Sequence, residues 1–384
     1  MERINKSISS IKSDNDISSL FRENKLSIVN NERKSRSAIK KINKEDSEEK
    51  NKLLSYGIIS LIGNTPLVKM DNITKRNAFN LYAKLEMYNP GQSAKARSAL
   101  SMISNAWKKG IIDHNTTIIE SSSGNLAVAV AQLANLLGFR FICVVDPKTS
   151  DNTLKILKAY KADIDMVETP DKISGEYLPT RINRVKELCK KIDNSFWLNQ
   201  YENIDNPLGY ERLMYEITYA LNNRVDYLFI AVSTCGTLRG CYNYIEKNNL
   251  KTKIIAVDAV GSVIFDNKKH KRLIPGHGAA IAPHFIEKGM YYKHINISDQ
   301  ESIQGCRYLL EKESILAGGS SGAIISAIKK MEKEISSSSN CVAILVDSGE
   351  RYLDTIYSDE WVEKHFKQSS ILSSGNTIKT TIQL

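Results

Sequence analysis

The chain has 384 residues, of which 42% are hydrophobic and 25% charged, and its formal net charge is +10. This composition is that of an ordinary soluble globular protein, long enough for two domains. The lysines and arginines are spread among acidic residues instead of clustering with aromatic ones. That pattern argues against a nucleic-acid groove and favours a solvated basic surface, which also suits acidic small substrates.

Neither the apolar runs nor the cysteines indicate a membrane, secreted or metal-binding protein. No apolar run is long enough to span a bilayer, and the N-terminus lacks the apolar segment of a signal peptide. The six cysteines form no C-x-x-C pair and no ligand cluster with histidine, so we expect reduced, structural thiols and no metal site. These features predict a cytoplasmic protein without membrane or nucleic-acid partners.

The two ends of the chain differ from the rest in composition. Residues 1–50 are polar and contain neither Gly nor Pro, and residues 369–384 are also polar. Such segments bury too little apolar surface to fold, so we expect a disordered extension and a flexible tail. The extension is rich in acidic residues, which argues against a transit peptide.

Between these ends, apolar runs alternate with helical patterns. Turn residues such as Gly138 and Asp146-Pro147 separate the elements. We expect strands at 81–86, 117–120, 139–145, 164–167, 227–232, 253–258 and 342–346, and helices from 95 onward, at 126–137, 153–160, 177–191, 210–221 and 299–311, and up to 331. This alternation predicts an α/β fold with parallel sheets covered by helices.

A turn of Pro, Gly and Ser, Asn89-Pro90-Gly91-Gln92-Ser93, brings Lys95 to the start of a helix. The positive end of the helix dipole disfavours the charged form of a lysine. An imine-forming lysine needs this, because only the neutral amine attacks a carbonyl. Taken alone, however, a lysine in such a place is more often a solvated surface charge.

Three further turns, rich in Gly, Ser and Thr, each precede a helix. In parallel sheets, turns of this kind lie at the carboxyl ends of strands, where ligands bind. The first turn, Ser233-Thr234-Cys235-Gly236-Thr237, offers backbone N–H groups and hydroxyls for a phosphate and matches no nucleotide-binding motif. The second turn, Ser121–Asn125, suits a carboxylate. In the third turn, Ser320 or Ser321 could face a ring nitrogen. Each turn could equally be an ordinary helix cap. Together with Lys95, they indicate a phosphorylated aldehyde cofactor, for which pyridoxal 5'-phosphate is the economical candidate.

Residues 55 to about 365 resemble the fold-type II pyridoxal-phosphate enzymes of the cysteine synthase and cystathionine β-synthase family. The motifs that carry this resemblance are Ile62-Gly63-Asn64-Thr65-Pro66-Leu67, Asn89-Pro90-Gly91 with Ser93 and Lys95, Ser122-Ser123-Gly124-Asn125, Ser233 to Thr237, and Gly319 to Ala323. Within this family, the sequence is similar to the enzymes of siderophore pathways that make a 2,3-diaminopropionate precursor. The segments that carry this narrower similarity are Cys143 to Lys148, Asn199-Gln200-Tyr201, Asp258-Ala259, Gly261 to Phe265, Arg351 to Asp354 and Tyr357 to Trp361.

The resemblance implies a two-domain fold like that of the tryptophan synthase β chain, with mostly parallel sheets flanked by helices. It implies a large cofactor-binding domain of residues 51–95 and 201–368 and a smaller, mobile substrate domain of residues 96–200, which would close over the substrate. The family also implies a homodimer.

The resemblance further implies a role for each motif residue. Lys95 would hold the cofactor covalently and, when freed, move the Cα proton, while Asn125 would bond the ring hydroxyl. The phosphate would lie on Ser233, Thr234, Cys235, Gly236 and Thr237, and the neutral hydroxyl of Ser320 would meet the pyridine nitrogen. Ser122, Ser123 and Gly124 would hold the substrate carboxylate, and Arg181, Tyr201 and Ser233 would receive the two substrates. For these last three residues a salt bridge, a core aromatic and a helix cap are equally open alternatives.

The implied reaction joins two anionic amino acids, consistent with an arginine in the site. O-phospho-L-serine loses phosphate to leave an α-aminoacrylate, and the amine of L-glutamate adds to its β-carbon, giving N-(2-amino-2-carboxyethyl)-L-glutamate. The alternatives are a cysteine synthase using O-acetylserine or O-phosphoserine with sulfide, a cystathionine β-synthase, and a catalytically silent binding partner.

The sequence departs from the family pattern at several positions. Ala96 stands where many relatives have Asp, so we expect a different local salt-bridge network but retained activity. Gln92 stands where relatives often have Gly or Thr, and His277 stands where an aliphatic residue is expected and is either a turn residue or a residue that reaches the cleft.

Overall fold

The computed structural model describes residues 52–75, 78–266 and 269–366. The predicted extension at 1–50 and the predicted tail at 369–384 lie outside the described residues. Two compact units divide the chain at residue 60, and the unit that begins at Leu61 carries all the strands of the described residues. The short 3₁₀ helix η1 (Gly57–Leu61) crosses this boundary.

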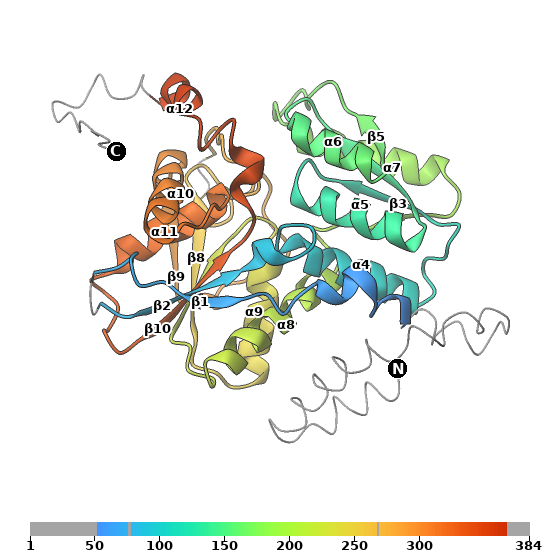
Figure 1. The fold of residues 1–384 in the computed structure, drawn as a ribbon. Helices are drawn as coiled ribbons and strands as arrows, with labels where there is room; N and C mark the ends of the chain where they lie inside the picture. The colour runs from blue at the N-terminus through green and yellow to red at the C-terminus, as the bar shows by residue number, and fades with distance from the viewer. Residues whose placement is uncertain (1–51, 76–77, 267–268, 367–384) are drawn as a thin grey trace. The chain divides into compact units, whose positions relative to one another are not determined.

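The larger sheet has six strands in the order β1-β2-β10-β7-β8-β9. Its strands are β1 (Leu67–Lys69), β2 (Asn80–Leu85), β7 (Tyr227–Ala231), β8 (Lys253–Ala259), β9 (Lys293–Ile297) and β10 (Asn340–Leu345). β1 pairs with β2 in antiparallel fashion, and every other neighbouring pair is parallel. The carboxyl ends of the five parallel strands therefore lie along one edge of the sheet (Figure 1).

A second sheet has four parallel strands in the order β5-β4-β3-β6. These are β3 (Thr117–Ser121), β4 (Arg140–Val145), β5 (Asp163–Met166) and β6 (Ser195–Trp197). β4 is buried from Phe141 to Val145, which explains why this part of its sequence is a continuous apolar run and does not alternate. The prediction of two mostly parallel sheets is confirmed.

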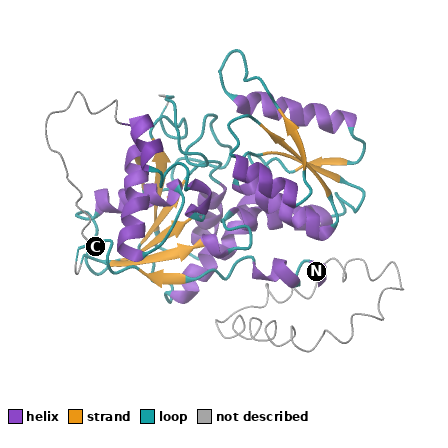
Figure 2. Ribbon diagram, turned by 45° about the horizontal axis from the view of Figure 1, so that its top comes forward, coloured by secondary structure: helices purple, strands orange, loops and turns teal. Residues whose placement is uncertain are grey.

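Helices connect the parallel strands and cover the sheets (Figure 2). They are α4 (Lys95–Lys108), α5 (Asn125–Leu137), α6 (Asp151–Ala159), α7 (Tyr177–Lys191), α8 (Asp205–Ala220), α9 (Gly236–Lys247), α10 (Asp299–Glu313), α11 (Gly319–Met331) and α12 (Asp359–Phe366), with 3₁₀ turns η2 (Glu86–Tyr88) and η3 (Gly349–Tyr352). Gly138 ends α5 at φ +76°, as its position after the last apolar residue predicts. No helix of the described segments is long and apolar enough to cross a membrane.

Both faces of the larger sheet are buried, each by its own apolar cluster. Phe229, Ile255 and Val257 belong to the cluster that includes residues of α11. Leu228 and Ile230, their alternating neighbours, belong to the cluster that includes residues of α8 and α9. This two-sided burial holds the carboxyl edge of the sheet in a fixed position.

Some elements differ from expectation. β9 and α12 were not predicted, because four of the five β9 residues are only half-buried and no residue of α12 is buried, so neither has a clear apolar pattern. α8 begins at Asp205, five residues before its predicted start, and Pro207 lies in its first turn, where the missing N–H costs nothing. All six cysteines are free, as predicted.

Candidate active site

Three chain segments far apart in the sequence meet where the central strand β10 ends. Ala94 donates its backbone N–H to Val346 O across 2.9 Å, and Ser93 forms an isolated bridge with Asp347. On the other side, Gly318 donates to Asp347 O across 3.0 Å. The turn before Lys95 and the turn before Ser320 are therefore both fixed to the carboxyl end of one buried strand.

Lys95 is the first residue of α4 and is partly exposed. Its charge acts on two buried groups from different turns. Burial raises the pKa of the Cys235 thiol to about 12, with the Lys95 charge lowering it in part. Burial also raises the pKa of the Asp347 carboxyl, and Lys95 is again among the charges that oppose the shift. The amine therefore lies near both the Ser233–Thr237 turn and the end of β10.

The turn Ser233–Thr237 joins β7 to α9. The N-cap residue Cys235 makes no side-chain capping bond, so it leaves the first N–H groups of α9 to other acceptors. It adopts φ +63°, the left-handed region in which a Cβ is disfavoured. A Cβ added to Gly236 would lie 2.6 Å from Asn206 Oδ1, so this position requires glycine. Backbone donors at a helix N-terminus with flanking hydroxyls suit a phosphate.

Asn125 is the first residue of α5, and both ends of its amide are held by residues near the end of β10. Its Nδ2 donates to Asp347 Oδ2 across 2.7 Å, and its Oδ1 accepts from the Arg351 guanidinium. Tyr352 donates its hydroxyl to the same Asp347 oxygen across 2.6 Å. Arg351 also donates to Gly91 O across 2.8 Å, which ties in the turn before Lys95.

The two serines at the start of α11, Ser320 and Ser321, differ in their hydrogen bonds. Ser321 is fully buried, and its Oγ accepts the backbone N–H of Val346 across 2.9 Å. Ser320 is 7% exposed and makes no such bond to the strand end. Of the two, Ser320 is the one whose hydroxyl remains available for a ligand.

The turn Ser122–Gly124 follows β3 and opens α5. Ser122 Oγ accepts the backbone N–H of Ala127 across 3.2 Å, so this hydroxyl serves as a helix cap, one of the two roles left open by the sequence. Ser123 and Gly124 are half-buried. The N–H of Gly124 makes a long contact of 3.5 Å with Ser122 Oγ. The N–H groups of Ser123 and Gly124 are therefore better candidates for a carboxylate than the Ser122 hydroxyl.

Arg181 lies on α7 and is 9% exposed. Its Nε is 3.2 Å from Asp146 Oδ2, yet Nε and NH1 have no hydrogen-bond partner among the described residues. Burial raises the pKa of the Tyr201 hydroxyl, and the nearby Arg181 charge lowers it in part. Arg181 and Tyr201 are therefore close, whereas no described contact brings Ser233 to either of them.

Glu120, at the end of β3, is a buried carboxyl beside this arginine. It accepts the backbone N–H groups of Ser121 (2.8 Å) and Gln200 (3.3 Å). Burial raises its pKa to about 7, against the effects of these bonds and of the Arg181 charge.

The departures from the family pattern have local explanations. His277 is 1% exposed, and its Nε2 lies 3.1 Å from Val257 O, so it is a buried turn residue and does not reach the cleft. Burial lowers its pKa to about 4. Ala96 is also buried, and the neighbouring Arg97 pairs with Glu86 and Glu216.

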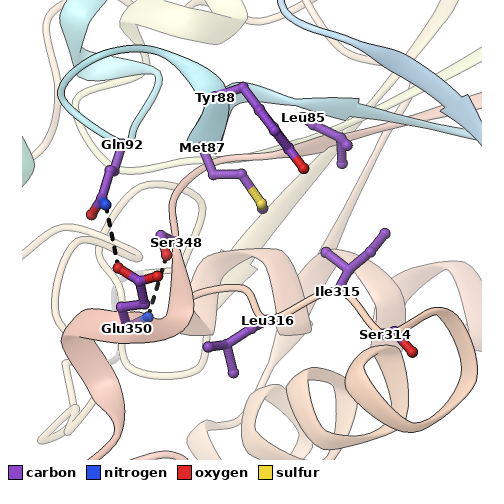
Figure 3. Close-up of a pocket in the computed structure, with 9 residues that line it drawn as sticks. All are labelled: Leu85, Met87, Tyr88, Gln92, Ser314, Ile315, Leu316, Ser348 and Glu350. Carbon is purple, nitrogen blue, oxygen red and sulfur yellow. Dashed lines mark hydrogen bonds between the residues drawn. The ribbon is translucent and has the colours of Figure 1, made fainter.

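A separate cavity of about 280 Å³ lies beside this region (Figure 3). None of the predicted site residues lines it; its walls are Leu85, Met87, Tyr88, Gln92, Ser314, Ile315, Leu316, Ser348 and Glu350. Gln92 Nε2 donates to Glu350 Oε2 across 3.3 Å at its rim. Gln92 thus belongs to the wall of this cavity, away from the proposed cofactor contacts.

The groups that meet at the carboxyl edge fit pyridoxal phosphate. A primary amine suits an aldehyde, and a helix N-terminus with hydroxyls suits a phosphate. An amide suits a ring hydroxyl, and a neutral hydroxyl suits a pyridine nitrogen. The fit is also supported by the start of α9, whose first N–H groups receive no capping bond from the Cys235 side chain.

Sequence reasoning gave no role to Asp347, Arg351 or Tyr352. Each is polar and follows the last predicted strand, at the edge where the three turns were expected. An acidic residue directly after a buried central strand was the signal available.

Comparisons with known proteins agree with this geometry. Residues 58–347 match the family described as "Pyridoxal-phosphate dependent enzyme". An O-acetylserine-dependent cystathionine β-synthase from Helicobacter pylori is 32% identical, covering 78% of this chain and 98% of that one, with a TM-score of 0.72. Cysteine synthase from Entamoeba histolytica is 30% identical over 79% of this chain and 90% of its own, with a TM-score of 0.73.

A hydrogen sulfide-producing enzyme from Fusobacterium nucleatum is likewise 30% identical, covering 77% of this chain and 99% of its own, with a TM-score of 0.72. The family match spans well over half of the chain and includes Lys95, Asn125 and the Ser233–Thr237 turn. The chain therefore belongs to the fold-type II pyridoxal-phosphate-dependent enzymes, as a β-replacement enzyme of the cysteine synthase family.

Proposed function

We propose that this enzyme joins O-phospho-L-serine and L-glutamate into N-(2-amino-2-carboxyethyl)-L-glutamate, a precursor of 2,3-diaminopropionate in siderophore or related biosynthesis. The Cβ–O bond of phosphoserine breaks with release of inorganic phosphate, and a bond forms between Cβ and the glutamate nitrogen. The Cα proton is removed and later returned, and the glutamate amine loses one proton, so the reaction needs no oxidant or reductant.

The observation that carries the proposal is the buried guanidinium of Arg181. Its Nε and NH1 have no hydrogen-bond partner in the described part of the chain, although the side chain is almost fully buried. Buried N–H groups on a cation are costly unless an acceptor fills them. A phosphate or a side-chain carboxylate supplies paired oxygen acceptors for both N–H groups, whereas sulfide offers a single, weak acceptor.

The other site residues take roles that follow from their chemistry. When bound, pyridoxal phosphate supplies an electron sink for removal of the Cα proton. Lys95, as the amine at the start of α4, is the base that takes this proton and returns it. The N–H groups of Ser123 and Gly124 hold the α-carboxylate, and Ser320 gives the pyridine nitrogen a neutral partner. We propose that Tyr201 and Ser233 bind the second substrate and that the enzyme works as a homodimer.

A second candidate is a cysteine synthase or a cystathionine β-synthase. It is supported by the printed activities of the relatives from Entamoeba histolytica and Helicobacter pylori, which are 30% and 32% identical to this chain. Both would use the same Lys95 chemistry with a sulfur nucleophile.

Product mass separates the candidates. The holoenzyme is incubated with O-phosphoserine or O-acetylserine, and with glutamate, sulfide or homocysteine. We expect the glutamate adduct from O-phosphoserine as the fastest reaction. Product formed only from O-acetylserine and sulfide would refute the proposal in favour of a cysteine synthase.

Arg181→Gln tests the role of the guanidinium, and Arg184→Gln is its matched control. Arg184 lies on the same helix but pairs with Asp165 and Glu187 and is more exposed. We expect Arg181→Gln to raise the KM of an anionic substrate by about 10- to 100-fold, the effect of losing a charged hydrogen bond of about 1.5–3 kcal/mol. Arg184→Gln should leave that KM unchanged.

A further inference from the structure

Asp347 occupies the junction of the site without a role assigned from the sequence or the family. It is 2% exposed and directly follows Val346, which accepts from the Lys95 turn. Its backbone bridges to Ser93 and accepts from Gly318. A carboxylate in such a place must be held by hydrogen bonds, because an unpaired buried charge is very costly.

The bonds of this carboxylate run to Asn125 and Tyr352. Both donate to Oδ2, across 2.7 Å and 2.6 Å, while Oδ1 has no hydrogen-bond partner within the described ranges. Arg351, which contacts the amide oxygen of Asn125, adds a positive charge nearby. The carboxylate is thus held by the Asn125 amide and the Tyr352 hydroxyl, with the charge of Arg351 nearby.

These contacts define the orientation of the Asn125 amide. A carboxylate only accepts and a guanidinium only donates, so the amide nitrogen must face Asp347 and the amide oxygen must face Arg351. The amide nitrogen carries two hydrogens, and the bond to Asp347 uses one of them. The second N–H is left in a fixed direction, which is what an amide that binds a ring oxygen needs.

The bond also joins two parts of the fold. Asn125 opens the helix that follows β3 of the four-stranded sheet, whereas Asp347 follows β10 of the six-stranded sheet. The Asp347–Asn125 hydrogen bond is therefore a direct side-chain link between the turn before α5 and the end of β10, to which the turn before Lys95 is hydrogen-bonded.

We propose that Asp347 is a positioning residue that acts through Asn125. It fixes the amide so that one N–H faces the cofactor ring hydroxyl and keeps the α5 turn in register with Lys95. The inference depends on the proposed role of Asn125, but not on which substrates the enzyme joins.

The test is a double-mutant cycle on the holoenzyme with Asp347→Ala, Asn125→Ala and the double variant. Two readouts are measured: the visible absorbance of bound pyridoxal phosphate as a function of pH, and kcat with O-phosphoserine and glutamate. We expect Asp347→Ala to shift the pH midpoint or position of the band and to lower kcat about 10- to 100-fold, a loss of 1.4 to 2.7 kcal/mol. In the Asn125→Ala background the same change should have little further effect.

Three companion variants make the result decisive. Asp347→Asn keeps an oxygen acceptor for Asn125 and should recover most of the spectral and kinetic loss. If Asp347 acted only through its negative charge, Asp347→Asn would show the same loss as Asp347→Ala. Tyr352→Phe removes the other bond to Oδ2 but leaves the Asp347–Asn125 bond in place, so it should perturb the spectrum less than Asp347→Ala does. Asp354→Ala removes an exposed carboxylate on the same segment and is the control for general effects.

Different outcomes would refute the role of Asp347 and the proposed function. If Asp347→Ala does not fold, Asp347→Ser replaces it in the cycle, because its shorter hydroxyl cannot span to Asn125. Additive effects of the two single changes, or an unchanged spectrum in folded Asp347→Ala or Asp347→Ser, would overturn the proposal. Failure to form the glutamate adduct would refute the proposed function alone, since the spectral cycle needs only the cofactor.

Discussion

Arg97 and Glu86 form a buried pair with two parallel hydrogen bonds, from Nε to Oε2 across 2.7 Å and from NH2 to Oε1 across 2.9 Å. The same guanidinium also donates to both oxygens of Glu216, which in turn receives the Lys84 amine at 2.7 Å. This cluster fixes the first turn of α4, two residues after Lys95. It also explains how the chain dispenses with an acidic residue at Ala96, because the arginine finds its carboxylates on η2 and α8.

Removing that arginine should therefore destabilise the fold strongly. Arg97→Leu leaves two buried carboxylates without their principal partner, and breaking a buried pair in this way costs about 3–5 kcal/mol. Urea unfolding measures the change, and Arg212→Leu is a control, since Arg212 is more exposed and lies 3.4 Å from Glu216. A loss below about 1 kcal/mol for Arg97→Leu would show that the cluster contributes little.

The cluster also gives a prediction for acid. Burial acts to raise the pKa of Glu216, but the Arg97 bonds and the Arg97 and Lys84 charges outweigh it and lower the pKa to about 2. A lowered carboxyl pKa contributes stability above its unfolded value near 4.3, which is lost as the pH falls toward 2. Glu216→Gln should flatten the stability curve between pH 4.5 and 2 and lower stability at neutral pH. An unchanged slope in this window would contradict the assignment.

Lys95→Ala should abolish the covalent link to the cofactor. Borohydride reduction of the holoenzyme followed by peptide mapping should place the pyridoxyl group on Lys95 and on no other lysine. The variant should lose at least about a thousandfold in kcat, as expected for a residue that acts covalently. Lys108→Ala, at the opposite end of the same helix, is the matched control. A pyridoxyl group at another position would refute the site.

Much of the fold was predictable because it depends on local patterns. Buried strands such as β7 are continuous apolar runs, and the turns after them contain the Gly, Ser and Thr that a close backbone approach requires. Strand β9 was not predictable, because four of its five residues are half-buried at the edge of the sheet and its sequence has no clear apolar pattern. Asp347 and Asn125 are 222 positions apart, and nothing local to either residue indicates the other as its partner.

Cys235 gives a prediction about the phosphate turn. Its φ of +63° costs about 1–2 kcal/mol for a residue with a Cβ, and a β-branched side chain fits this region worse. Cys235→Gly should therefore keep or tighten cofactor binding, whereas Cys235→Val should weaken it about tenfold, or 1.4 kcal/mol. Titration of the apoprotein with pyridoxal phosphate measures both, and Cys235→Ala separates backbone strain from loss of the thiol. Equal affinities for the Gly and Val variants would show that the turn does not depend on this backbone conformation.

Glu120 and His277 should move the pH dependence of stability in opposite directions. Burial raises the pKa of Glu120 to about 7, so its carboxyl is held neutral in the fold and folding loses stability as the pH rises from about 4.5 to 7. Burial lowers the pKa of His277 to about 4, so the neutral ring must take up a proton on unfolding and stability falls as the pH drops from about 6.5 to 4. Each group acting alone contributes a slope of up to about 1.4 kcal/mol per pH unit in its window.

Single variants separate the two effects. Glu120→Gln keeps an acceptor for one of the two backbone N–H groups and removes the titrating carboxyl. Compared with the unmodified enzyme, this variant should therefore lose less stability between pH 5 and pH 7. His277→Gln keeps a donor for Val257 O and should reduce the loss of stability between pH 6 and 4. Urea unfolding at half-unit pH steps measures both slopes, with His365→Gln as a control because that histidine is exposed. If the Glu120 and His277 variants shifted the slope in the same direction, at least one of the two buried groups would titrate by a cause other than its burial.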